Sequence, residues 1–238
     1  MRAKGSSIAR ILGLAFLIGT IGTVWAEDAK PPFPPVMAPI AEYLEASASA
    51  EIALARSAAP PSISGDASVL VLGKDGYDTA AKGKNGFVCL VWRAWAGPGG
   101  FDAPDFWDPK YRAPICFNPA GARSVVPAYL ERTKWALAGI SKAEMRDRTI
   151  AAIASNRMAT PDPSTLAFMM SKGDGQGHLN HWQPHVMLFL AHTVAADLGA
   201  GLKGVPLIAF PGAPEPVTVF DVFVPVYSDG TPVSAEKH

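Results

Sequence analysis

The stretch Lys84-Asn-Gly-Phe-Val-Cys-Leu-Val-Trp92 carries the clearest secondary-structure signals of the chain. Asn85-Gly86 is typical of a two-residue hairpin turn, because these residue types tolerate the positive φ that a type I′ turn requires. The apolar run that follows predicts a strand from Gly86 to Trp92. We therefore expect a β-hairpin that leads into a buried strand carrying Cys89.

Upstream of this strand, residues 40–59 are rich in Ala, Leu, Glu and Arg, with apolar residues at four-residue spacing. This pattern predicts one amphipathic helix that ends before Pro60-Pro61. Residues 69–72 form a short apolar run that predicts a strand. Lys74-Asp75-Gly76 then predicts the turn of a hairpin.

Downstream, residues 119–138 predict a helix that ends at Gly139. Ser141 and Glu144 have the spacing of a capping box and predict the start of a second helix, which runs to about Asn156. The last third of the chain contains four apolar runs separated by Gly and Pro, which predict strands at 166–170, 186–190, 205–210 and 217–226.

Strands and helices thus occur in separate runs, which favours the α+β class with an antiparallel sheet. We expect about five to seven strands, an N-terminal helix and a central helix pair. The order of elements is similar to that of PAS-like or profilin-like sensory folds. Because element order alone carries this similarity, it predicts no ligand.

The composition excludes several classes of protein. Hydrophobic residues make up 49% of the 238 residues and charged residues 18%, which is unlike a disordered chain, a coiled coil or a collagenous repeat. Lys plus Arg equals Asp plus Glu at 21 each, so the chain lacks the basic excess of nucleic-acid-binding proteins. A small-molecule ligand is the partner class that we expect.

The N-terminus has the pattern of a secretory signal peptide. Arg2, Lys4 and Arg10 precede the apolar run Ile11–Ile21, and Val24-Trp25-Ala26 resembles a cleavage site. The alternative is an uncleaved membrane anchor, but a span needs about 20 apolar residues. We therefore expect a periplasmic or secreted protein with no stable membrane insertion after cleavage. The predicted organisation is a signal peptide at 1–26, a proline-rich extended leader at 27–39 and a single domain at 40–238.

Export also determines how the two cysteines are interpreted. An oxidising compartment favours a disulfide between Cys89 and Cys116, which would tie the predicted strand to the start of a later helix. The alternative is a nucleophilic thiol. Cys89 has no acid or base beside it in the run 87–91 that would lower its pKa, so the disulfide is the preferred interpretation.

Four of the five histidines fall within fifteen residues, at 178, 181, 185 and 192. His178, His181 and His185, with Asp174, are candidate ligands of a transition metal such as zinc. The segment lacks the glutamate of an HExxH motif. The structural alternative is that His185 is a buried, hydrogen-bonded histidine at the start of a strand, while His178 and His192 are exposed.

Residues 94–114 predict a long irregular loop that is rich in aromatic side chains. Trp95, Phe106 and Trp107 are candidates for stacking on a planar ligand, with His181 and His185 as polar contacts. The alternative is that the three rings pack on the core, since aromatic residues dominate cores as readily as binding sites.

Five segments resemble exported bacterial proteins of uncharacterised activity: Ile52–Arg56, Gly86–Val91, Pro114–Pro119, Met169–Lys172 and His181–His185. The resemblance implies no activity. It does imply a histidine at the position of Gln183, which would give a His-x-His-x-His strand face. Because glutamine is a poorer ligand for zinc or copper than imidazole, Gln183 weakens the predicted metal site.

Two classes of function remain. The first is an exported small-molecule-binding or sensory module. The second is a metal-dependent hydrolase that uses the histidine cluster at 178–185 to activate water. The sequence contains no G-x-S-x-G or Walker motif. We therefore prefer the binding module.

Overall fold

The computed structural model describes residues 33–173, 175–176, 183–191, 196–205, 207–209 and 213–233. The predicted signal peptide and the first part of the predicted leader, residues 27–32, lie outside these ranges. Residues 33–39 contain no helix or strand. The described residues belong to one unit of the chain, Pro32–His238.

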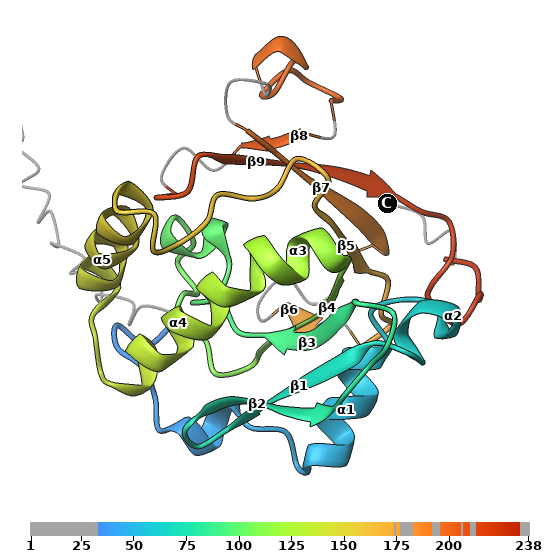
Figure 1. Ribbon diagram of the computed structural model, residues 1–238, viewed down its shortest axis with the longest axis horizontal. Coiled ribbons are helices and arrows are strands. Elements are labelled where there is room, and N and C mark those ends of the chain that lie inside the picture. Colours follow the sequence, from blue (N-terminus) through green and yellow to red (C-terminus); the bar gives the residue numbers. More distant parts are fainter. Residues whose placement is uncertain are drawn as a thin grey trace, which may run out of the picture. The chain divides into compact units, whose positions relative to one another are not determined.

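The helices and strands follow one another in separate runs, as predicted: helices up to residue 64, strands at 68–117 with one 3-10 helix between them, helices at 119–154 and strands from 166 onward (Figure 1). The described helices are the 3-10 helices η1 (Ile40–Tyr43) and η2 (Pro98–Phe101) and the α-helices α1 (Ala48–Arg56), α2 (Pro61–Ser64), α3 (Pro119–Ser124), α4 (Val126–Leu137) and α5 (Lys142–Ala154). The described strands are β1 (Ser68–Gly73), β2 (Gly76–Ala81), β3 (Val88–Trp92), β4 (Tyr111–Phe117), β5 (Leu166–Met169), β6 (Gly175–Gln176), β7 (His185–Ala191), β8 (Leu207–Ala209) and β9 (Val217–Phe223).

The strands form a sheet in the order β2-β1-β3-β4-β5-β7-β9-β8, and β6 pairs with β4 beside this path. This arrangement confirms the α+β class. The sheet is mixed rather than purely antiparallel, because β1 and β3 run parallel while the other neighbours are antiparallel. The nine strands of the described residues exceed the upper end of the expected range, seven, by two, and the short strands β6 and β8 account for the excess.

The hairpin predicted at Asn85-Gly86 is wrong. Gly86 has a φ of +79°, as such a turn requires, but β2 and β3 are not neighbours, because β1 lies between them. The Asn85 amide donates to the Ile63 carbonyl over 2.8 Å, which fixes the connection against the end of α2. The hairpin between β1 and β2 is confirmed, with Gly76 at a φ of +125°.

The helix predicted over residues 40–59 is interrupted. After η1 the backbone of Leu44 is extended, and a new helix begins at Ser47, whose hydroxyl accepts the Ala50 amide over 3.1 Å. This N-cap satisfies a backbone donor that the continuous helix would have bonded internally. The helix α1 ends at Arg56, ahead of the two prolines.

The predicted bounds of the central helices agree with the structure more closely than those of the N-terminal helix. Residues 119–138 form α3 and α4, which meet at Val125, and Gly139 ends α4 with a φ of +73°. The Ser141 hydroxyl caps α5 by accepting the Glu144 amide over 3.2 Å. These ends depend on local capping, which explains why the sequence predicts them.

Alternating side chains of β3 and β4 divide between two layers of helix. Leu90, Ile115 and Phe117 belong to a core cluster with residues of α4, whereas Val91 belongs to a cluster with Ala55 of α1. The helices α3 and α4 thus cover one face of the sheet, and α1 covers the opposite face of β1, β3 and β4 (Figure 1).

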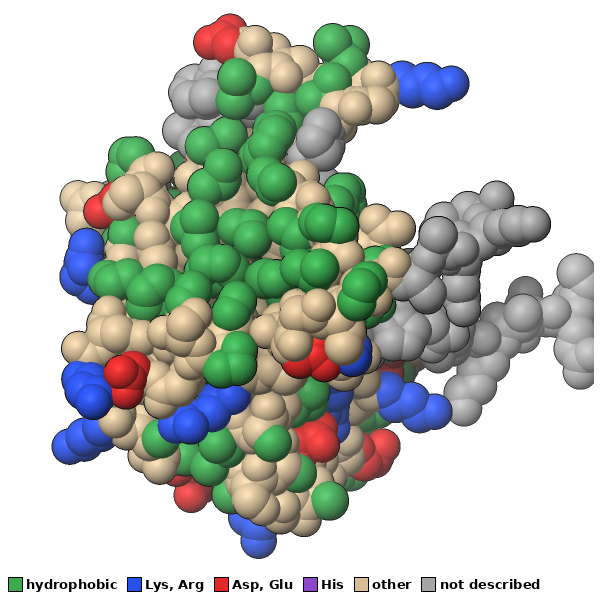
Figure 2. All heavy atoms as spheres, turned by 90° about the vertical axis from the view of Figure 1, so that its right-hand side faces the viewer, with side chains coloured by type: hydrophobic (Ala, Val, Ile, Leu, Met, Phe, Trp, Pro, Cys, Tyr) green, Lys and Arg blue, Asp and Glu red, His purple; other side chains and the backbone are tan. Residues whose placement is uncertain are grey.

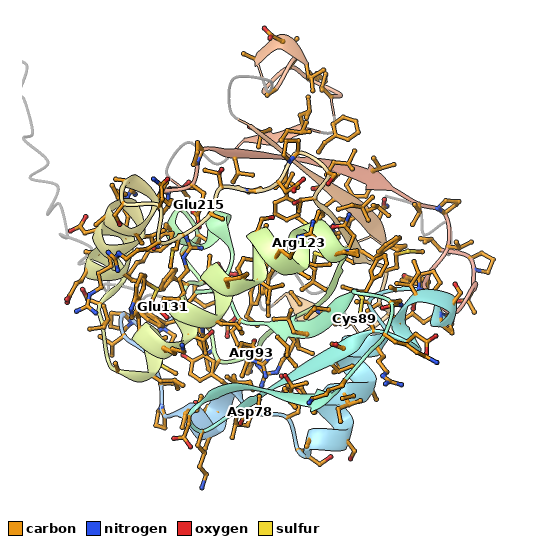
Figure 3. The ribbon with its side chains drawn as sticks, viewed as in Figure 1. Asp78, Cys89, Arg93, Arg123, Glu131 and Glu215 are labelled. Carbon is orange, nitrogen blue, oxygen red and sulfur yellow. A yellow bond between two sulfur atoms is a disulfide. The ribbon has the colours of Figure 1, made fainter. Side chains whose placement is uncertain are left out.

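Cys89 and Cys116 form the predicted disulfide (Figure 3). The predicted place of Cys116 is wrong, however, because it lies in β4, directly opposite Cys89 of β3, and not at the start of a helix. The bond therefore joins two neighbouring strands on the face that α1 covers. A disulfide of this kind is typical of proteins that fold in an oxidising compartment.

Apolar side chains also reach the surface. Figure 2 shows them gathered on the side where β7 begins and β9 ends, and at the end of β9 Val222 is 40% and Phe223 52% exposed. Within the described residues, no helix has the length and apolar character needed to cross a membrane.

Candidate functional site

A hollow of about 420 Å³ lies between α4, α5 and the turn that follows α5. Its volume falls within the range of about 300–1,000 Å³ that is common for small-molecule sites. The residues that line it are Pro127, Leu130, Glu131, Lys134, Trp135, Ala152, Arg157 and Met158.

The sequence of α4 explains why one side of this helix faces the hollow. Positions 127, 130, 131, 134 and 135 follow the i, i+3, i+4, i+7, i+8 spacing of a single helical face. Val126, Tyr129, Thr133 and Ala136 are buried on the other side. The helix therefore buries one stripe in the core and presents a second stripe to the hollow.

The hollow has an apolar floor and a charged rim. Ala152 and Met158 are buried and form a small cluster to which Trp135 adds its ring. Lys134 lies on the exposed rim, where its Nζ is 3.6 Å from Oε2 of Glu131 (labelled in Figure 3). Arg157 is a second cation, and its Nε donates to the Ser155 hydroxyl over 3.1 Å. Two cations against one carboxylate leave the rim with one positive charge.

A buried ion pair fixes the position of α4. Arg132 is fully buried and pairs with Glu215 in the turn before β9, while its Nη1 donates to the Ala96 carbonyl over 2.9 Å. Burial lowers the pKa of the Arg132 guanidinium. Because these contacts join α4 to two distant segments, they hold the α4 wall of the hollow in place.

A second buried ion pair, between Arg93 and Glu51, lies on the side of the sheet that α1 covers. Nη2 of Arg93 (labelled in Figure 3) lies 2.9 Å from Oε2 of Glu51 in α1, and Nε donates to the Tyr43 carbonyl over 3.0 Å. The other carboxylate oxygen of Glu51 accepts the Leu72 amide of β1 over 3.2 Å. Each group has its partners, so this pair is a structural link between the sheet and α1.

The three candidate aromatic residues lie in the core. Trp95, Phe106 and Trp107 are buried, with 4.6 Å between the ring centroids of Phe106 and Trp107 and 6.1 Å between those of Trp95 and Trp107. The Trp95 indole donates to the Thr133 hydroxyl over 3.1 Å, on the side of α4 that faces away from the hollow. Stacking on a ligand would require these rings to leave the core, and it stays a prediction.

The irregular loop predicted at 94–114 is shorter than expected, because β4 begins at Tyr111.

Most of the candidate metal ligands lie outside the described residues, namely Asp174, His178 and His181, as does His192. His185 is the first residue of β7 and is buried, with Nδ1 2.8 Å from the Gln183 carbonyl oxygen. Burial lowers the pKa of His185, and the bond to Gln183 acts against this shift. The arrangement of His185 is the one that the structural alternative expects.

The described residues contain no group of three or more His, Cys, Asp and Glu side chains that could hold a metal ion. Of the four predicted metal ligands, only His185 lies within the described residues, where its ring packs on Phe223 with 5.9 Å between centroids. The metal site stays a prediction.

Asp221 of β9 was not identified as a candidate from the sequence. Asp221 pairs with Met187 of β7, and His185, two residues before Met187, lies on the same face of the sheet. It is 1% exposed, and neither carboxylate oxygen has a hydrogen-bond partner among the described residues. Burial raises its pKa to about 7. The sequence signal that could have identified Asp221 is the presence of an acidic residue inside the apolar run 217–226. At neutral pH such a carboxyl can both donate and accept a proton.

Comparisons with family models, curated proteins and solved structures gave no match for this chain. The resemblance to exported bacterial proteins therefore stays a prediction. The similarity to PAS-like or profilin-like folds does so too.

Proposed function

We propose that the protein is an exported small-molecule-binding module whose ligand occupies the hollow between α4 and α5. The observation that carries the proposal is the combination of a hollow of about 420 Å³ with a Trp135 wall and a positively charged rim. Small-molecule sites commonly combine apolar walls with a few placed polar groups.

The chemistry of the rim suggests the class of ligand. The Trp135 ring and Met158 offer contact to a planar apolar body, and Arg157 offers a guanidinium that can bind a carboxylate through two parallel hydrogen bonds. Glu131 partly neutralises Lys134, so Arg157 is the principal cation for the ligand. We propose a planar monocarboxylate, such as an aromatic acid, as the ligand.

The disulfide between Cys89 and Cys116 supports the proposed export, because disulfides persist in oxidising compartments. The periplasm or the cell exterior is the proposed location. A sensory role of the PAS-like or profilin-like kind would use the same hollow as its input site.

Isothermal titration calorimetry with indole-3-acetate and benzoate tests the proposal. Wild type is expected to give saturable binding of at least one of these acids. Arg157→Gln should weaken it about tenfold, since it removes a charge-assisted hydrogen bond. Trp135→Leu should weaken it several-fold. Arg123→Gln, which removes an exposed cation on α3, is the matched control and should bind like wild type. Equal affinities in wild type and Arg157→Gln would contradict the proposed site.

The metal-dependent hydrolase remains the second proposal. Its support within the described residues is that His185 and Asp221 lie on one sheet face in neighbouring rows of β7 and β9. A carboxyl with a raised pKa beside a histidine suits general acid–base chemistry. Elemental analysis separates this proposal from the first.

A further inference from the structure

A second hollow, of about 350 Å³, lies where the end of α1 and α2 meet the turn after β9. Arg56, the last residue of α1, lines it. Ser57, Ser64, Ser228 and Asp229 contribute polar side chains. These residues come from three parts of the chain and share no lining residue with the hollow between α4 and α5.

Backbone hydrogen bonds hold the walls of this hollow together. The Met170 amide donates to the Ala58 carbonyl, and the Ser228 amide donates to the Met170 carbonyl, both over 2.9 Å. The hydroxyls of Ser57 and Ser171 lie 2.6 Å apart. The end of α1, the end of β5 and the turn after β9 are thus joined at the hollow, so the site is formed in advance.

Arg56 is the unusual group in this hollow. Within the described part of the chain its guanidinium forms no ion pair, and its Nε is buried without a hydrogen-bond partner. A buried donor without a partner costs stability, so such a group calls for an explanation. The nearby carboxylate does not supply one, because Asp229 is bound by Lys172 over 2.8 Å and by the Thr231 hydroxyl over 2.6 Å. The hollow therefore keeps an uncompensated positive charge.

The position of Arg56 at the end of α1 offers a simpler explanation of its charge. The test below must distinguish this explanation from ligand binding. A cation in the last turn of a helix interacts favourably with the helix dipole. This role accounts for the charge of Arg56, but it does not account for the hollow beside it.

We propose that this second hollow binds a small oxyanion, either a carboxylate or a phosphate, through the Arg56 guanidinium. The fork of guanidinium donors fits both oxyanions. The Ser228 hydroxyl forms no hydrogen bond within the described residues and is available as a further donor. The Ser64 hydroxyl is not available, because it donates to the Ala59 carbonyl over 3.1 Å.

Titration of the protein with sodium phosphate and with sodium succinate, each against sodium chloride of equal ionic strength, tests this site. Calorimetry of wild type is expected to show saturable binding of one of the two anions, which identifies the class. Arg56→Gln should weaken that binding about tenfold or more. Ser228→Ala should weaken it by a smaller factor. Lys84→Gln removes an exposed cation that pairs with Asp66 over 3.4 Å and should leave binding unchanged.

Two results would overturn the proposal. One is that neither anion binds wild type beyond the chloride control. The other is that Arg56→Gln, shown to be folded by circular dichroism, binds the anion as wild type does. If Arg56 acts only on the helix dipole, Arg56→Gln lowers the thermal midpoint, and phosphate or succinate raises that midpoint no more in wild type than in the variant.

Discussion

Arg132 of α4 forms an ion pair with Glu215, which lies in the turn before β9. The ion pair links the central helices to this turn. Arg132 is fully buried, and its guanidinium also lies over the Phe101 ring, 4.8 Å from the centroid. The pair thus joins α4, the aromatic loop and the sheet. The orientation of α4, and with it the hollow, depends on this contact.

Removing one partner of this pair should therefore destabilise the protein strongly. Glu215→Gln leaves the Arg132 charge buried and is expected to cost about 3–5 kcal/mol in the free energy of unfolding by urea. Glu131→Gln breaks the exposed pair with Lys134 and should cost under about 1 kcal/mol. Similar losses in the two variants would show that the buried pair does not hold α4.

The disulfide should add stability that a reductant removes. The double variant Cys89→Ala, Cys116→Ala is expected to lose about 2–4 kcal/mol relative to the oxidised protein. Urea unfolding with and without dithiothreitol measures this, and the double variant should be insensitive to the reductant. Labelling of two thiols in the denatured protein without prior reduction would contradict the bond.

Asp221 should make stability depend on pH. Its pKa of about 7 in the folded protein lies above the ordinary 3.8, so the folded state holds the proton more tightly than the unfolded chain. The stability that the neutral carboxyl contributes is complete below the unfolded pKa and is lost as the pH rises to about 7. Asp221→Asn should therefore be more stable relative to wild type at pH 8 than at pH 4.

Urea unfolding of wild type and Asp221→Asn at these two pH values measures the effect. The exposed Asp78→Asn of β2 serves as the control, with the same small change in stability at both pH values. A change in stability for Asp221→Asn that is equal at pH 4 and pH 8 would show that the pKa of Asp221 is not raised.

The metal hypothesis has its own test. It predicts about one transition-metal ion per chain by elemental analysis of protein purified without a histidine tag or chelator. The His181→Ala and His185→Ala variants should both lose the metal. Absence of metal from wild type would remove the hydrolase proposal and leave the binding module.

The parts of the fold that depend on local signals could be predicted from the sequence, whereas the pairing of strands far apart in the chain could not. Ser141, Gly139 and the apolar runs of the last third act through neighbours in the chain, and their elements were predicted to within a few residues. The parallel pairing of β1 with β3 joins distant segments, so the Asn85-Gly86 signal gave the wrong partner strand.

The first residues of β4, including Pro114, lie inside the predicted loop 94–114. Proline lacks the amide that a central strand uses for pairing, so it argues against a strand. In the structure Pro114 is paired with Val91 of β3, whereas β5 pairs with β4 only at Cys116 and Phe117. Pro114 thus lies where one side of β4 is free of β5, which is the kind of place where a strand tolerates proline.

The candidate site was less predictable than the fold. The second stripe on α4, which includes Trp135, can be read from the sequence, but the hollow depends on how α5 and the turn at Arg157 pack against it. The sequence instead drew attention to Trp95, Phe106 and Trp107, which have the residue types of a binding site but lie in the core.

Photolabelling with 4-azidobenzoate, an aromatic acid of the proposed class, tests the location of the ligand site most directly. After irradiation and proteolysis, mass spectrometry should find the label on residues 127–135 or 152–158, and an excess of benzoate should prevent it. Label on residues 95–107, or label that benzoate does not displace, would contradict the assignment of the hollow between α4 and α5 as the ligand site.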